Sequence, residues 1–302
     1  MFDPNRYAIA RTTPRRMASP FWLGHIPFAF SLVDALRPHT IVELGTYSGS
    51  SLAALCQAVE AVGLSTRCYG IDSWAGDVHM SYDESVYDDV SQYMKSTYPG
   101  IAELVRARFD DAVDRFADAS IDLLHIDGTH TYEGVSNDYR KWLPKLSDRG
   151  VMMFHDIHVT EDLFGAGAQV FGVRRFFDEV KYRYPHFEFS HSCGLGVLVV
   201  GRNISARMND LLDASQEKAC QKFFATLGNG LIWEFERNSH GLLSVVARRA
   251  VRSARRLWRR GARGIWQLPS YHVGSDELSS RDSALAPHGD HTLPQVGVGP
   301  SR

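Results

Sequence analysis

The sequence predicts an α/β fold in which a mostly parallel sheet carries helices on both faces. Between about residues 39 and 200, short apolar runs alternate with helical patterns, as is typical of parallel strands joined by crossover helices. Several of these runs are continuously apolar, which is expected of strands buried on both sides. Seven strands are predicted: Thr40–Leu44, Arg67–Asp72, Glu103–Arg108, Ile121–Asp127, Gly150–His155, His186–Ser190 and Gly194–Val200.

Helical patterns occupy the intervals between these strands. The clearest has apolar residues at Val170, Val173, Phe176, Phe177 and Val180, close to a period of 3.6 residues. An apolar segment, 21–36, is expected to pack as a helix before the first strand, and the insertion 73–99 is expected to be helical in part. The remaining predicted helices lie at 50–62, 110–117, 132–146 and 168–182.

Composition and charge exclude several classes of protein. The 302 residues are 44% hydrophobic and 23% charged, the mixture of a soluble globular chain. No apolar run approaches the roughly 18–20 residues that cross a bilayer, and no apolar core of a signal peptide is seen near residue 1. The four cysteines are far apart and form neither a zinc pattern nor a disulfide framework. We therefore expect a cytoplasmic protein with reduced thiols.

The chain divides into five segments by composition. We expect an N-terminal segment with a packing helix (1–38), the α/β domain (39–203) and a helical extension (204–241). A basic amphipathic helix (242–268) follows. The tail 269–302 is rich in Ser, Gly, Pro and His and is predicted to be disordered, because it buries too little surface to offset its ordering entropy.

A glycine-containing turn follows the first predicted strand. The strand contains Glu43, and the turn Gly45-Thr46-Tyr47-Ser48-Gly49 leads through Ser50 into a helix. Glycines allow a ligand to approach the backbone closely, and Asp72, at the end of the next strand, could accept both hydroxyls of a ribose. A tight turn in any α/β protein is the simpler alternative. Glu43 would repel a pyrophosphate, so a cationic cofactor such as S-adenosylmethionine is favoured over NAD.

The run from Glu43 to Gly49 resembles the first motif of class I S-adenosylmethionine-dependent methyltransferases, especially the catechol O-methyltransferase-like branch. The resemblance extends over about residues 21–201 and implies the Rossmann-like fold of that class, with a C-terminal helical extension here. It implies that the loop holds the methionine moiety above Glu43 and that Asp72 binds the ribose. It also places four further residues beside the adenine or the acceptor: Ser73, Trp74, Asp110 and Asp111.

A second polar group lies at the ends of the fourth and fifth predicted strands. Asp127 and His130 follow the fourth strand, while His155 and Asp156 follow the fifth. In a parallel sheet both ends open at the same edge, so these side chains could converge beside the cofactor. Methyl transfer to a hydroxyl requires removal of its proton, for which His130 is a candidate base, and carboxylates can hold Mg²⁺. Ordinary turns, with Thr131 capping the next helix, are the alternative.

This second group resembles the sugar O-methyltransferases of macrolide biosynthesis and the related cephalosporin hydroxylase-like proteins. The resemblance implies that Asp127 binds a divalent metal and His130 is the base, with His155 and Asp156 at the second metal position. His155 stands where the family has a carboxylate, which favours softer ions than Mg²⁺. The implied reaction is methylation of a hydroxyl on a sugar, a glycan or a glycosylated small molecule. A metal-dependent hydroxylase and a non-catalytic cofactor-binding protein stay open.

Residues 242–266 form a basic amphipathic segment. Eight arginines lie within 248–263 without an acidic residue, so the rest of the chain has 25 basic and 35 acidic residues, a net charge of −10. With Trp258 and Trp266 at its end, the segment suits the surface of an anionic membrane. Nucleic acid is a less favoured partner, and a solvated helix is the simplest alternative. Peripheral membrane attachment is therefore a hypothesis. Formation of a homo-oligomer is a separate hypothesis.

Overall fold

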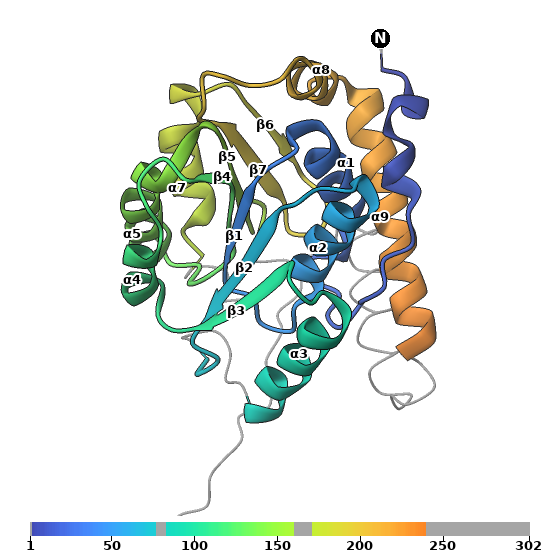
Figure 1. Ribbon diagram of the computed structural model, residues 1–302. Helices are drawn as coiled ribbons and strands as arrows, with labels where there is room; N and C mark the ends of the chain where they lie inside the picture. Colours follow the sequence, from blue (N-terminus) through green and yellow to red (C-terminus); the bar gives the residue numbers. More distant parts are fainter. Residues whose placement is uncertain (1, 77–82, 160–170, 240–302) are drawn as a thin grey trace, which may run out of the picture. The chain divides into compact units, whose positions relative to one another are not determined.

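The computed structural model describes residues 2–76, 83–159 and 171–239, which lie in one compact unit, Met1–Ala262. Its centre is a seven-stranded sheet with the order β3-β2-β1-β4-β5-β7-β6 (Figure 1). Among the described strands, β7 runs in the opposite direction to the other six. The predicted mostly parallel sheet is confirmed. The strands are β1 (Thr40–Leu44), β2 (Arg67–Asp72), β3 (Ala102–Arg106), β4 (Ile121–Ile126), β5 (Leu146–His155), β6 (His186–Phe189) and β7 (Leu195–Val199).

Helices cover both faces of the sheet, and two buried apolar clusters lie between them and the strands (Figure 1). One cluster contains residues of α1 (Ile26–Leu36), α2 (Ser50–Val62), α3 (Glu84–Thr97), α8 (Ala206–Ser215) and α9 (Lys218–Ser239). The other contains residues of α4 (Phe109–Ala112), α5 (Tyr132–Trp142) and α7 (Val173–Val180). Short 3-10 helices η1 (Pro4–Arg11), η2 (Leu23–His25), η3 (Val113–Arg115), η4 (Leu143–Lys145) and η6 (Lys181–Arg183) complete the described elements.

Several helix boundaries differ from those predicted. The helix predicted at 132–146 ends at Trp142, because Pro144 lacks an amide hydrogen and the chain passes through η4 into β5. The strand therefore begins four residues earlier than expected, at Leu146 instead of Gly150. The helix predicted at 110–117 is split into α4 and η3. The helix predicted at 168–182 is helical from Val173, and residues 160–170 lie outside the described part of the chain.

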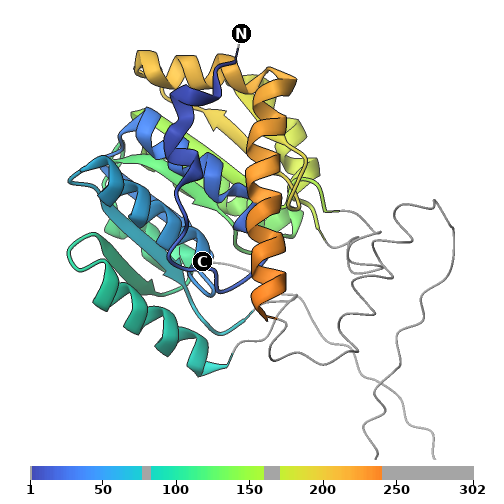
Figure 2. The same cartoon turned by 90° about the vertical axis from the view of Figure 1, so that its right-hand side faces the viewer.

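The N-terminal segment and α9 lie side by side on one face of the sheet (Figures 1 and 2). A close approach of the two lies between Gly24 in η2 and Gly228 in α9. A Cβ atom added at Gly228 would lie 2.0 Å from the carbonyl oxygen of Gly24, far inside van der Waals contact. Two backbones therefore meet here without intervening side chains, which only glycine permits.

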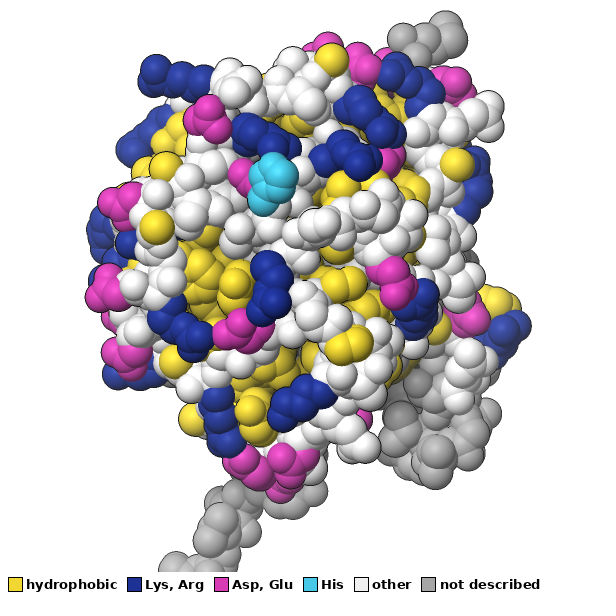
Figure 3. Space-filling model, viewed as in Figure 1, with side chains coloured by type: hydrophobic (Ala, Val, Ile, Leu, Met, Phe, Trp, Pro, Cys, Tyr) yellow, Lys and Arg dark blue, Asp and Glu magenta, His cyan; other side chains and the backbone are white. Residues whose placement is uncertain are grey.

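The described surface carries both signs of charge. On the face shown in Figure 3, basic side chains in dark blue are interspersed with acidic side chains in magenta. Among the helices of the described residues, none is long and apolar enough to span a membrane. The basic segment predicted at 242–268 and the tail 269–302 lie outside the described residues.

The contact between Gly24 and Gly228 predicts opposite effects of two alanine substitutions in α9. Gly228→Ala should lower the free energy of unfolding by about 1–3 kcal/mol, because the added methyl group must push the η2 backbone away. Gly230→Ala should raise it by up to about 1 kcal/mol, since nothing lies within 4 Å and alanine favours helix. Urea unfolding of both variants measures the difference. Equal shifts in both would contradict the packing described here.

Candidate active site

A cavity of about 480 Å³ opens at the edge of the sheet where β1, β2 and β4 end. Seven of the predicted site residues line it, and together they join the loop after β1 to the polar group after β4. These seven are Gly45, Tyr47, Asp72, Ser73, Asp110, Asp127 and His130. The sequence-based expectation that the two motifs face one another is thus met by a single shared cavity.

Gly45 allows the loop after β1 to lie against the end of β4. Its φ is +96°, and a Cβ atom at this position would lie 2.0 Å from the carbonyl oxygen of Asp127. Its amide donates to the carbonyl oxygen of Ile71 at 2.9 Å, which ties the loop to β2 as well. Any larger residue would separate the loop from Asp127.

Asp72 is held by two backbone amides. Its Oδ2 accepts from the amide of Tyr47 at 2.9 Å, and its Oδ1 accepts from the amide of Trp74 at 2.8 Å. A carboxylate oxygen can accept more than one hydrogen bond. The two amide hydrogen bonds therefore fix the orientation of this carboxylate at the cavity wall.

Other predicted cofactor residues have different partners and are not part of the cavity wall formed by the described residues. Trp74 is buried, and its indole donates to the carbonyl oxygen of Tyr47 at 2.9 Å, so it supports the loop from behind. Ser50 accepts from the amides of Ala18 and Ser19. Asp111 is exposed on α4. The other predicted cofactor residues outside the wall are Glu43, Thr46, Ser48 and Gly49, and the predicted metal residues His155 and Asp156 are outside it as well.

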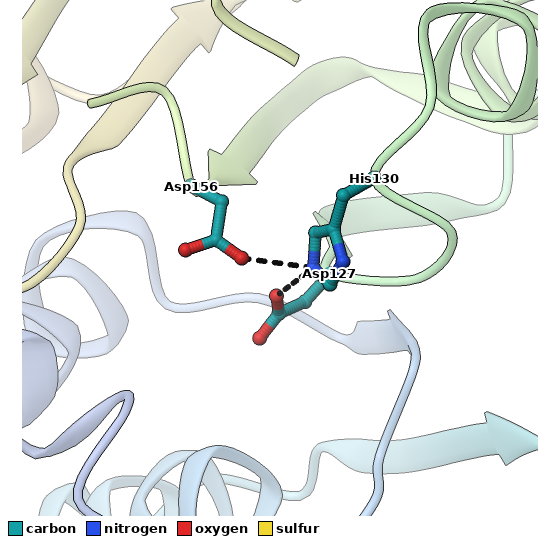
Figure 4. A group of neighbouring side chains, drawn as sticks. All are labelled: Asp127, His130 and Asp156. Carbon is teal, nitrogen blue, oxygen red and sulfur yellow. Dashed lines mark ion pairs between the residues drawn. The ribbon is translucent and has the colours of Figure 1, made fainter. Parts of the chain in front are cut away.

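Asp127, His130 and Asp156 converge from the ends of β4 and β5 (Figure 4). His130 Nε2 lies 2.9 Å from Asp156 Oδ2 and 3.5 Å from Asp127 Oδ1. One ligand atom from each of the three residues lies within 4.8 Å of the others. His130 also stacks on Phe171, with ring centroids 5.0 Å apart. The predicted N-cap is present too, since Thr131 Oγ1 accepts from the amide of Gly134.

His155 supports this group from the protein interior. Its Nδ1 lies 3.1 Å from Asp127 Oδ1 and 3.3 Å from Asp156 Oδ1, and its Nε2 lies 3.2 Å from the carbonyl oxygen of Ser192. All three neighbours are acceptors, so both ring nitrogens must donate. The metal-ligand role of His155 stays a prediction, since a cation at Nδ1 would have to replace the proton between this nitrogen and the two carboxylates.

Charge and burial oppose one another in this group. Burial disfavours the protonated form of His130, but its hydrogen bonds with Asp127 and Asp156 outweigh this and raise the pKa to about 9. Burial likewise opposes protonation of His155, and the charges of both carboxylates raise its pKa well above the ordinary value. Although burial would raise them, the pKa values of Asp127 and Asp156 are lowered because the histidines stabilise the charged carboxylates.

The donor set of Asp127, His130 and Asp156 fits a divalent cation. Two carboxylates and one imidazole at this spacing are ligands that several first-row metals and Mg²⁺ accept. A cation there would compete with the proton on His130, because both would use the same nitrogen lone pair.

Asp138 is a cavity residue that the sequence analysis did not identify. It lies on α5, is 4% exposed, and lines the cavity beside Asn137. Burial, reinforced by the negative charge of Asp110, raises its pKa to about 7. The sequence did contain a signal for this residue. Asp138 falls on the buried stripe of α5 that contains Val135 and Tyr139, where a carboxylate is unusual. Further wall residues not predicted include Arg108, Phe109, Gly128 and Thr129.

Comparison with known families bears on the part of the chain that builds this cavity. Residues 42–157 match a family model described as "Methyltransferase domain". This span runs from β1 through the end of β5 and includes both polar motifs. The match covers less than half of the chain. It agrees with the resemblance of this segment to methyltransferases.

A relative of this chain occurs in Sinorhizobium fredii (strain NBRC 101917 / NGR234). The protein, "Uncharacterized protein y4gI", is 38% identical over 216 residues. The match covers 70% of this chain but 23% of the relative. The chain thus spans about a quarter of the length of the curated relative that it matches.

Solved structures with similar folds include S-adenosylhomocysteine-bound PaMTH1 of Podospora anserina, with 12% identity and a TM-score of 0.46 over 58% of this chain and 76% of that one. The O-methyltransferase TomG of Streptomyces achromogenes, solved with S-adenosylmethionine, has 14% identity and a TM-score of 0.45 over 67% of this chain and 100% of that one.

The raised pKa of Asp138 predicts a pH-dependent stability difference. The folded protein holds this proton up to about pH 7, whereas the unfolded chain loses it near pH 4. The stability contribution is therefore complete below pH 4 and is lost as the pH rises to 7. Asp138→Asn should be more stable than the wild type by about 1–3 kcal/mol at pH 8 and equal to it near pH 4.

Urea unfolding at several pH values measures this difference. Asp111→Asn is the matched control, because the same change at an exposed carboxylate of the adjacent helix should leave the pH dependence unchanged. A pH-independent difference for Asp138→Asn would contradict the assignment.

Proposed function

We propose that this chain transfers the methyl group of S-adenosylmethionine to a hydroxyl oxygen of a sugar, a glycan or a glycosylated small molecule. One observation carries the proposal. The cavity wall contains the loop glycine Gly45, the oriented carboxylate Asp72, and the polar pair Asp127 and His130. A cofactor bound at the first two groups would present its reactive end to the pair.

The charge of the cavity wall supports this cofactor. Among the described residues, four carboxyl groups line the cavity, at Asp72, Asp110, Asp127 and Asp138, against one guanidinium at Arg108. Such a wall disfavours a pyrophosphate and suits a cofactor with cationic groups. S-adenosylmethionine supplies a methyl group already activated on a sulfonium. The protein's own tasks are then to align the acceptor and to take up its proton.

His130 is proposed as the base that receives the hydroxyl proton. It must be neutral to do so, and its pKa of about 9 means that the neutral form is the minor one at pH 7. Asp127 and Asp156 stabilise the imidazolium that forms when the proton arrives. In the alternative in which the same three side chains hold a divalent cation, His130 is not the base, and the cation would instead activate the hydroxyl by lowering its pKa.

The proposed acceptor follows from chemistry and resemblance together. A sugar hydroxyl is a weak acid, so its methylation benefits from a base or a cation beside the reacting oxygen. The segment from Asp127 to Asp156 resembles sugar O-methyltransferases, and in this chain it places carboxylates and an imidazole at the cavity edge.

Calorimetry with S-adenosylhomocysteine tests the cofactor assignment. We expect micromolar binding by the wild type. Asp72→Asn should weaken it at least 10-fold, because the carboxylate that accepts from the ribose is lost. Asp111→Asn, at an exposed position, should bind as the wild type does. Equal affinity of the wild type and Asp72→Asn would refute the ribose assignment.

Methyl transfer from labelled cofactor to a library of sugars and glycans tests the reaction. His130→Gln should reduce kcat at least 100-fold while leaving S-adenosylhomocysteine affinity within about 3-fold. The wild-type rate should rise between pH 7 and 9 as His130 loses its proton. Oxygen consumption without methyl transfer would instead favour the metal-dependent hydroxylase.

We also propose that residues 242–266 attach the protein to anionic membrane surfaces. The described end of α9 leads towards this segment and carries an exposed indole at Trp233, with the guanidinium of Arg237 4.7 Å from its ring centroid. An indole and an arginine are both suited to the interface of a bilayer.

Sedimentation of the full chain with phosphatidylserine vesicles tests this attachment. Changing the eight arginines of 248–263 to glutamine should abolish sedimentation, whereas changing them to lysine should retain it, because the attraction depends on charge. Sedimentation should also weaken in high salt. Undiminished sedimentation of the glutamine variant would disprove a role for this segment.

A further inference from the structure

A buried hydrogen-bonded chain connects the N-terminal segment to the strand that precedes the cofactor loop. The indole Nε1 of Trp22 donates to Nε2 of His125 at 3.1 Å, and Nδ1 of His125 lies 2.9 Å from Oε2 of Glu43. Glu43 and His125 have no solvent exposure, and Trp22 is 4% exposed. Most buried polar side chains have at least one hydrogen-bond partner.

This chain lies one layer beneath the cavity. Glu43 and His125 are direct neighbours on the paired strands β1 and β4. Two residues further along the same strands come Gly45 and Asp127, which line the cavity. Because side chains two residues apart point to the same face of a sheet, Glu43 and His125 belong to the face that carries Asp127.

The indole determines where the proton of His125 resides. An indole nitrogen can only donate, so Nε2 of His125 must be the acceptor. The single proton of the neutral ring is then on Nδ1, where it is donated to Glu43. A second carboxylate competes for this proton, since Oδ2 of Asp127 lies 3.9 Å from Nε2 of His125. With Trp22 in place, His125 donates its proton to Glu43 and not to Asp127.

The two carboxylate oxygens of Glu43 differ in their hydrogen bonding. Its Oε1 is buried and has no hydrogen-bond partner among the described residues. A buried carboxylate with an unsatisfied oxygen is costly, and a nearby cationic ligand would offset that cost. The cofactor loop begins immediately after this strand, so the charge of Glu43 lies close beneath the proposed site of the amino acid portion.

The N-terminal segment holds the cofactor loop at further points. Arg16 Nε donates to the carbonyl oxygen of Ser48 at 2.8 Å, and the amides of Ala18 and Ser19 donate to Ser50 Oγ at 3.1 Å each. The segment from Arg16 to Trp22 therefore contacts the loop directly and also reaches the strand beneath it through His125.

We propose that Trp22 is a positioning residue of the cofactor site. By directing the proton of His125 to Glu43, it keeps this carboxylate oriented beneath the loop, where its charge favours the cationic amino acid portion of the cofactor. The inference rests on the proposed function and adds to it a part of the chain that lies outside the family match at 42–157.

Calorimetry with two ligands tests the proposal. Trp22→Phe keeps an aromatic ring but removes the N–H donor, and it should weaken S-adenosylhomocysteine binding about 5- to 10-fold. Binding of methylthioadenosine, which has the same nucleoside but no amino acid portion, should change less than 2-fold. A general distortion of the cavity would weaken both ligands equally, and that result would overturn the proposal.

Trp142→Phe is the matched control. Trp142 is equally buried, but it lies in the apolar cluster on the other face of the sheet. Its indole nitrogen has no hydrogen-bond partner among the described residues. The same substitution there should leave both affinities unchanged. An equal loss of S-adenosylhomocysteine affinity in Trp142→Phe would show that the effect does not arise from the chain through His125.

Two further measurements separate this inference from the proposed function. Nitrogen-15 NMR should show the Nδ1–H tautomer of His125 in the wild type and a shift towards Nε2–H in Trp22→Phe. In a His125→Gln background, Trp22→Phe should have no further effect on affinity, since the two residues act in series. If the wild type binds neither ligand, the proposed function fails; an Nε2–H tautomer in the wild type refutes this inference alone.

Discussion

The central physical constraint of this molecule is the placement of two largely buried carboxylates at the ends of adjacent parallel strands. Asp127 and Asp156 can be ionised there only because an imidazole approaches from each side, His130 from the cavity and His155 from the interior. The backbone carbonyl of Ser192 completes the arrangement by accepting from His155. The polar centre is therefore a balanced group of charges whose members depend on one another.

This balance divides the cavity into two chemical regions. Towards β2, Asp72 is held by backbone amides and keeps a constant orientation. Towards β5, His130 shares its proton with the carboxylates of Asp127 and Asp156. The proposed methyl transfer needs both regions, because the donor must be immobile while the acceptor's proton must move. Glycine at position 45 brings the two regions within one cavity.

Much of this arrangement follows from the sequence, because parallel strands end at a common edge and polar residues after them must meet there. That reasoning identified Asp72, Asp127, His130 and Asp156. It could not identify the role of His155, since the direction of its ring depends on Ser192, 37 residues away. Trp22 was missed for the same reason, its partner His125 being 103 residues distant. Helix ends were displaced where a local signal, Pro144, competes with a longer apolar pattern.

The contact between Gly24 and Gly228 has a consequence for how the protein can be divided. A recombinant fragment trimmed to residues 39–203 would lose both backbones of this contact, together with Trp22 and the helix that covers η2. Its exposed apolar face would favour aggregation, and low solubility of such a fragment would say nothing about the intact chain. Biochemical work should begin from a chain that retains α9.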